Sequence, residues 1–63
     1  MALRRGQFVM IRYRLPVERR NRKNPEDDGR RWAQRRYPAT GFIKRLRDVG
    51  VTEIEIEGKN IDS

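Results

Sequence analysis

The sequence predicts a small α+β domain, a ββαβ unit in which a short antiparallel sheet carries one helix packed on one face. Three observations support this fold class. Every odd position over 8–15 is apolar, apolar residues recur at helical spacing over 41–49, and apolar residues alternate with polar ones over 51–57. A chain of 63 residues is expected to form a single domain, with a basic N-terminal lead at 1–6 and a mobile basic loop at 17–29.

The first predicted strand covers residues 8–15, where the odd positions are all apolar and would face a core. The even positions change from apolar Phe8 and Met10 to charged Arg12 and Arg14. Pro16 is expected to end the strand, because proline has no backbone N–H to donate to a neighbouring strand.

Residues 30–37 allow two interpretations. As a strand, the segment pairs with residues 8–15 in a hairpin whose tip is the acidic turn, and Trp32 shares one face with Gln34 and Arg36. As a helix, it must end near Tyr37, since the following proline disfavours helical conformation. We favour the strand, because a third strand makes the sheet broad enough for a helix to cover.

A helix over residues 41–49, a glycine stop and a strand over 51–57 complete the predicted fold. Thr40 is the expected N-cap, and Gly50 can adopt the left-handed conformation that ends a helix. The alternative is a hairpin of 41–47 with 51–57, but it would leave Ile43 on the same face as the glutamates. The predicted core comprises Val9, Ile11, Tyr13, Leu15, Phe42, Ile43, Leu46, Val49, Ile54 and Ile56.

The sheet face away from the helix is expected to carry Arg12 and Arg14 beside a row of glutamates, forming cross-strand ion pairs. That row would repel phosphate, and Phe8 would be the only aromatic residue on the face. This face is therefore expected to be a poor platform for nucleic acid. The predicted glutamate row is Glu53, Glu55 and Glu57.

Several function classes are disfavoured by composition. The chain has no cysteine and no histidine, which removes thiol chemistry and the usual zinc ligands. The acidic run 26–28 lacks the spaced oxygen ligands of a calcium loop, and no nucleophile with a base is evident. We expect no enzymatic activity, no metal and no cofactor. No apolar run is long enough for a signal peptide or a membrane span, so we expect a cytoplasmic protein without a membrane partner.

The net charge of +7 is unevenly distributed. Residues 1–36 carry twelve basic and four acidic groups, whereas residues 37–63 carry four basic and five acidic groups. Arginine binds phosphate through several donors, and an aromatic ring can stack on an unpaired base. The expected nucleic-acid-binding residues are Arg19, Arg20, Arg22, Lys23, Arg30, Arg31, Trp32, Arg35 and Arg36.

The expected function is that of a small basic accessory protein that binds DNA or RNA, of the kind that phages and mobile elements encode. The alternative is an adaptor or inhibitor that docks its arginine-rich loop and Trp32 on an acidic surface of a larger enzyme. Homodimer formation is a further expectation, since a chain of this length buries little surface alone.

Overall fold

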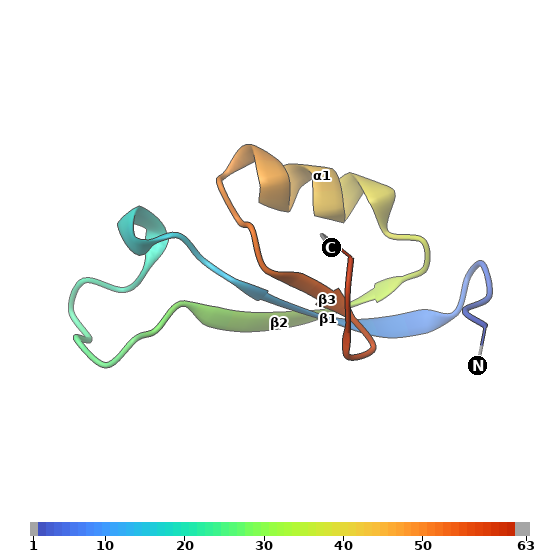
Figure 1. Ribbon diagram of the computed structural model, residues 1–63, viewed down its shortest axis with the longest axis horizontal. Coiled ribbons are helices and arrows are strands. Elements are labelled where there is room, and N and C mark those ends of the chain that lie inside the picture. The colour runs from blue at the N-terminus through green and yellow to red at the C-terminus, as the bar shows by residue number, and fades with distance from the viewer. Residues whose placement is uncertain (1, 62–63) are drawn as a thin grey trace.

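The computed structural model describes residues 2–61, which form a four-stranded antiparallel sheet with one α-helix across one face (Figure 1). The strand order is β2-β1-β3-β4. This arrangement confirms the predicted α+β fold class and adds a short fourth strand that the sequence analysis did not expect. The elements in chain order are β1 (Phe8–Arg14), the 3-10 helix η1 (Val17–Arg19), β2 (Arg30–Arg36), α1 (Thr40–Asp48), β3 (Ile54–Ile56) and β4 (Lys59–Asn60).

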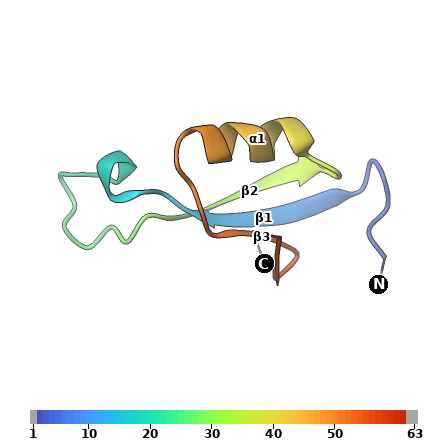
Figure 2. The same cartoon turned by 45° about the horizontal axis from the view of Figure 1, so that its top comes forward.

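Strands β1 and β2 form the long hairpin that dominates the molecule. They pair over their whole lengths, from Phe8 opposite Arg36 to Arg14 opposite Arg30. The pairing continues beyond the loop end, where the Leu15 N–H donates to the carbonyl oxygen of Gly29 (2.7 Å). The strand interpretation of residues 30–37 is therefore correct. The molecule extends 39 × 20 × 20 Å along its three principal axes. The hairpin and its loop lie along the longest of these axes (Figure 2).

Helix α1 ends at the glycine stop that the sequence predicts. Gly50 has a φ of 96°, its N–H donates to the carbonyl oxygen of Arg47 (3.0 Å), and the Val51 N–H donates to that of Leu46 (3.0 Å). These two bonds satisfy carbonyl groups that the last turn would otherwise leave unpaired. The alternative hairpin of 41–47 with 51–57 is wrong.

The start of α1 differs from the prediction. Thr40 is already helical, and Ala39 occupies the N-cap position with a φ of 51° and no side-chain capping bond. The Ile43 N–H donates to the carbonyl oxygen of Ala39 (3.0 Å). The chain turns into the helix through the left-handed conformation of Ala39, so the helix begins one residue earlier and the Thr40 hydroxyl has no capping role.

The core lies between α1 and the sheet. Of the ten predicted core residues, six are buried and four are partly buried at its margin, namely Tyr13, Leu15, Phe42 and Val49. Val51 was absent from the predicted core but is 3% exposed, because the chain after Gly50 folds back against the last turn of the helix. The buried residues are Val9, Ile11, Ile43, Leu46, Val51, Ile54 and Ile56. Within residues 2–61, no helix has the length and apolar character needed to cross a membrane.

Candidate nucleic-acid interface

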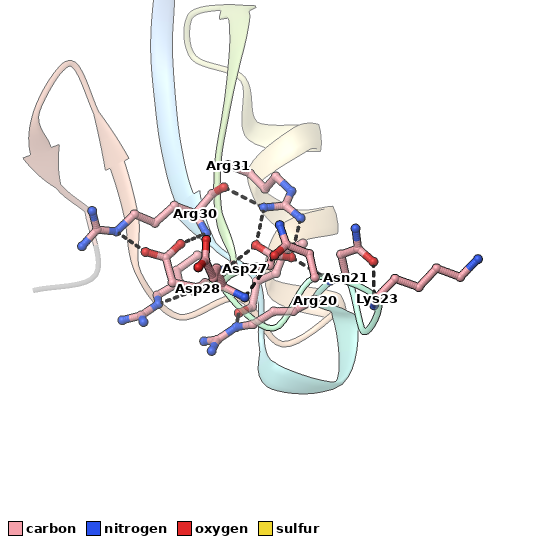
Figure 3. Close-up of polar contacts among 12 residues, drawn as sticks. Arg20, Asn21, Lys23, Asp27, Asp28, Arg30 and Arg31 are labelled. Atoms are coloured by element: carbon pink, nitrogen blue, oxygen red, sulfur yellow. Dashed lines mark hydrogen bonds and ion pairs between the residues drawn. The ribbon is translucent and has the colours of Figure 1, made fainter.

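The loop between β1 and β2 is organised around the carboxylate of Asp27. Arg31 donates to both of its oxygens, from Nη1 to Oδ1 (3.0 Å) and from Nη2 to Oδ2 (2.9 Å), and the backbone N–H groups of Asn21 and Gly29 donate to it as well (Figure 3). The Asp27 side chain is only 9% exposed. A mobile loop with an acidic turn was expected here, and the segment contains the 3-10 helix η1 and further hydrogen-bonded turns. Its mobility stays a prediction.

A second aspartate, Asp28, links the loop to the ends of β1 and β2. Asp28 Oδ2 lies 3.1 Å from Arg30 Nε, and its backbone carbonyl oxygen accepts from Arg14 Nε (2.7 Å). Gly29 is buried with a φ of 85°, and a Cβ there would lie 2.7 Å from the carbonyl oxygen of Leu15. The loop therefore joins the strands in a defined geometry. In Figure 3 the guanidinium groups of Arg20 and Arg30 extend to one side and Lys23 to the other.

The loop should depend on pH through Asp27. The hydrogen bonds from Arg31, Asn21 and Gly29 hold the pKa of Asp27 well below its ordinary value. A carboxyl group with a lowered pKa stabilises the fold above its unfolded-state pKa of about 3.9, and this contribution is lost as the pH falls through the folded-state value. The urea midpoint should therefore fall on acidification below about pH 4 less steeply in Asp27→Asn than in the unchanged protein.

Glu26→Gln is the matched control for that experiment. Glu26 neighbours Asp27 in the loop, but its side chain is exposed and forms no ion pair with the described residues. Its variant should follow the unchanged protein across the acid range. If Asp27→Asn did so too, the carboxylate of Asp27 would not be anchoring the loop.

The face of the sheet opposite α1, which we call the open face, is lined by alternate residues of each strand. Opposite residues in paired strands share a face, so the register places Trp32 beside Arg12 and Arg30 beside Arg14. On the other side of β1, Glu55 lies directly opposite Arg12. The open-face residues are Phe8, Met10, Arg12 and Arg14 of β1, Arg30, Trp32, Gln34 and Arg36 of β2, Glu55 of β3 and Asn60 of β4.

Two large aromatic side chains are exposed on this face. Trp32 is 66% exposed and Phe8 is 55% exposed. The Arg36 guanidinium lies over the Phe8 ring, 4.5 Å from its centroid, whereas no ring or cation contact to Trp32 is found among the described residues. The expectation that Phe8 would be the only aromatic residue here is wrong. The pairing of β1 with β2 places Trp32 on the same face as Phe8 and Arg12, and the expectation did not take this pairing into account.

A depression of about 650 Å³ opens on this face near the loop. Trp32 and arginines form one part of its lining, and carboxylates of the segment around β3 form another. The site therefore brings an aromatic surface, hydrogen-bond donors and hydrogen-bond acceptors together. Its lining residues are Arg12, Tyr13, Arg14, Arg30, Arg31, Trp32, Glu53, Glu55 and Asn60.

The expected cross-strand ion pairs do not form. Arg12 and Glu55 are directly opposite each other, but the ion pairs among the described residues are those of Arg30 with Asp28 and Arg31 with Asp27. Glu57 instead accepts a hydrogen bond at Oε1 from the backbone N–H of Met10 (2.7 Å). Glu57 thus bonds to the backbone of β1 and Arg14 to the backbone of the loop, instead of forming the predicted ion pairs across the sheet.

The structure divides the nine predicted binding residues into three groups. Arg19, Arg20, Arg22 and Lys23 belong to the loop or its short helix, and Arg30, Trp32 and Arg36 to the open face. Arg31 and Arg35 lie on the opposite face, where Arg35 sits over the Phe42 ring at 4.6 Å and Arg31 is held by Asp27. Arg12 and Arg14 were correctly expected on the exposed face of the sheet, but they were not counted among the binding residues because the neighbouring glutamates were expected to repel phosphate.

The chain matches no known family model, and no curated protein or solved structure resembles it significantly. Throughout residues 2–61, no group of three His, Cys, Asp or Glu side chains is arranged to hold a metal ion.

Proposed function

We propose that this protein binds nucleic acid, with the phosphates contacting arginines of the loop and the open face and an unpaired base stacking on Trp32. The observation that carries the proposal is the exposed indole of Trp32, which lies beside Arg12 and one cross-strand row from the neighbouring pair of Arg14 and Arg30. Guanidinium groups neutralise phosphates, and aromatic faces accept any base, so this combination suits a strand with unpaired bases.

The supply of unpaired cations supports the same proposal. Of the eight predicted phosphate-binding cations, only Arg30 and Arg31 form ion pairs with carboxylates of the described residues. Arg20 is partly engaged, since its Nε donates to the carbonyl oxygen of Leu15 (3.0 Å). The exposed Arg19 and Arg22 reach no carboxylate within residues 2–61. Most of the positive charge around the loop is thus left for an external anion.

The glutamates limit where a strand can run. Glu53, Glu55 and Glu57 lie on or beside β3, whereas the arginines of the open face lie on β1 and β2. A phosphate chain is attracted to one half of the face and repelled from the other. The proposed path therefore follows the hairpin lengthwise toward the loop.

The test is a salt titration of binding to labelled single- and double-stranded DNA and RNA oligonucleotides, measured by fluorescence anisotropy. Each phosphate neutralised on a single strand contributes about 0.7 to the slope of log affinity against log salt. Arg19→Ala combined with Arg22→Ala should therefore flatten the slope by about 1.4 if each contacts one phosphate.

Lys44→Ala combined with Arg45→Ala is the matched control, because it removes the same charge from exposed positions of α1. Its slope should stay near that of the unchanged protein. Equal slopes for the two double variants would show that the loop makes no specific phosphate contact. Failure of all four nucleic acids to bind at low salt would overturn the proposal and leave an acidic protein surface as the partner to test.

A further inference from the structure

One cross-strand row of the open face combines three kinds of group. Trp32 on β2, Arg12 on β1 and Glu55 on β3 lie side by side, because the register pairs Arg12 with each of the other two. All three line the same depression. Neighbouring side chains in such a row have Cβ atoms about 4.5–5.5 Å apart, so the outer two of the three lie about 9–11 Å apart and all three can reach a single nucleobase placed over the row.

The two charged members of the row are not used by the fold. Arg12 and Glu55 form no ion pair with each other and no side-chain hydrogen bond with another residue of 2–61. Arg14 and Arg30, in the next row, are held at Asp28. The row therefore presents one set of unpaired donors and one unpaired acceptor beside an exposed aromatic ring.

Guanine is the base whose edges complement this set of groups. Its N7 and O6 both accept hydrogen bonds, and arginine donates to the two together. Its N1–H and N2–H₂ groups both donate, and a carboxylate has two oxygens to receive them. Adenine places an amino donor where guanine has O6, cytosine offers an amino donor on a smaller ring, and thymine has no amino group.

We propose that this row binds an unpaired guanine, which stacks on Trp32, accepts from Arg12 at O6 and N7, and donates to Glu55 from N1 and N2. The inference rests on the proposed function and deepens it by naming the base. It also requires a single-stranded or looped ligand, since N1 and N2 of guanine are occupied by cytosine in a duplex. The carboxylate that repels phosphate thereby gains a role as the acceptor for a base.

The test compares four labelled DNA 12-mers, oligo-dT and the same oligonucleotide with one central dG, dA or dC, together with the corresponding RNA set. Each good bidentate pair discriminates by about 1–3 kcal/mol, so even one of the two proposed pairs should make the dG oligonucleotide bind about 5- to 150-fold more tightly than oligo-dT. Glu55→Gln should reduce this preference while oligo-dT binding is retained. Replacing dG by 7-deazaguanine, which lacks N7, should weaken binding to the unchanged protein but not to Arg12→Ala.

Glu53→Gln is the matched control, since it removes the same charge from another carboxylate that lines the depression. It should keep the guanine preference. Equal affinity for all four 12-mers would overturn the guanine inference while leaving nucleic-acid binding intact. Absence of binding to every oligonucleotide would instead contradict the proposed function itself. Loss of the preference in Glu53→Gln but not in Glu55→Gln would overturn the assignment to Glu55.

Discussion

Replacing Trp32 by alanine is expected to weaken binding of a single-stranded oligonucleotide by about 5- to 150-fold with little change in stability. Stacking of one base on an aromatic side chain is worth about 1–3 kcal/mol, and 1.4 kcal/mol corresponds to tenfold in affinity. The stability should change by no more than about 1 kcal/mol, because the side chain is 66% exposed and packs on no other ring of residues 2–61.

The only tryptophan of the chain reports on this contact directly. A base that stacks on Trp32 should quench its fluorescence, and the quenching curve should give the same dissociation constant as anisotropy. Trp32→Phe is the conservative variant and should keep most of the affinity. If Trp32→Ala bound single strands as tightly as the unchanged protein, the open face would not be where bases lie.

Replacing Leu46 by alanine is expected to lower the free energy of unfolding by about 2–5 kcal/mol. Leu46 is 6% exposed and belongs to the buried cluster between α1 and the sheet. Alanine and leucine differ little in helix propensity, so the loss should report the emptied space in the core. A domain of this size is stable by only about 3–9 kcal/mol, and the variant should therefore unfold at a much lower urea concentration.

Two further variants keep that measurement interpretable. Arg45→Ala truncates the adjacent, exposed residue of α1 and should change stability by no more than about 0.5 kcal/mol. Leu46→Met conserves volume and should cost less than about 1.5 kcal/mol, which gives a measurable midpoint even if the alanine variant is unfolded. A midpoint for Leu46→Ala equal to that of Arg45→Ala would show that α1 does not cover the sheet.

Local patterns were sufficient to predict most of the fold. Apolar residues recur every second position in β1 and β3 and at helical spacing in α1. Because each spacing follows from the geometry of one kind of element, the two changes of spacing located these three elements. The helix start was wrong by one residue, since the left-handed turn at Ala39 has no signal in the residue type. Strand β4 was missed because two residues are too few to show a period.

The candidate site was predicted in composition but not in arrangement. The arginine-rich loop and Trp32 stand out from the sequence because charge and aromatic residues are visible without a fold. The anchoring of the loop was not predicted, since it depends on Asp27 meeting Arg31 and two backbone N–H groups at once. The sequence left residues 30–37 open between strand and helix. Only once they are known to form a strand do Arg30 and Arg36 fall on one face of β2 and Arg31 and Arg35 on the other.

The sequence by itself determined where β1, α1 and β3 lie, which of their faces are apolar, and the excess of arginine before residue 37. Only the tertiary structure decided which side chains are direct neighbours across the strands, because that depends on strand register. A strand pattern states that alternate residues point in opposite directions, but a shift of one residue in pairing would reverse the neighbours. The observed register places Trp32, Arg12 and Glu55 in one row, and no local property of those three residues contains that information.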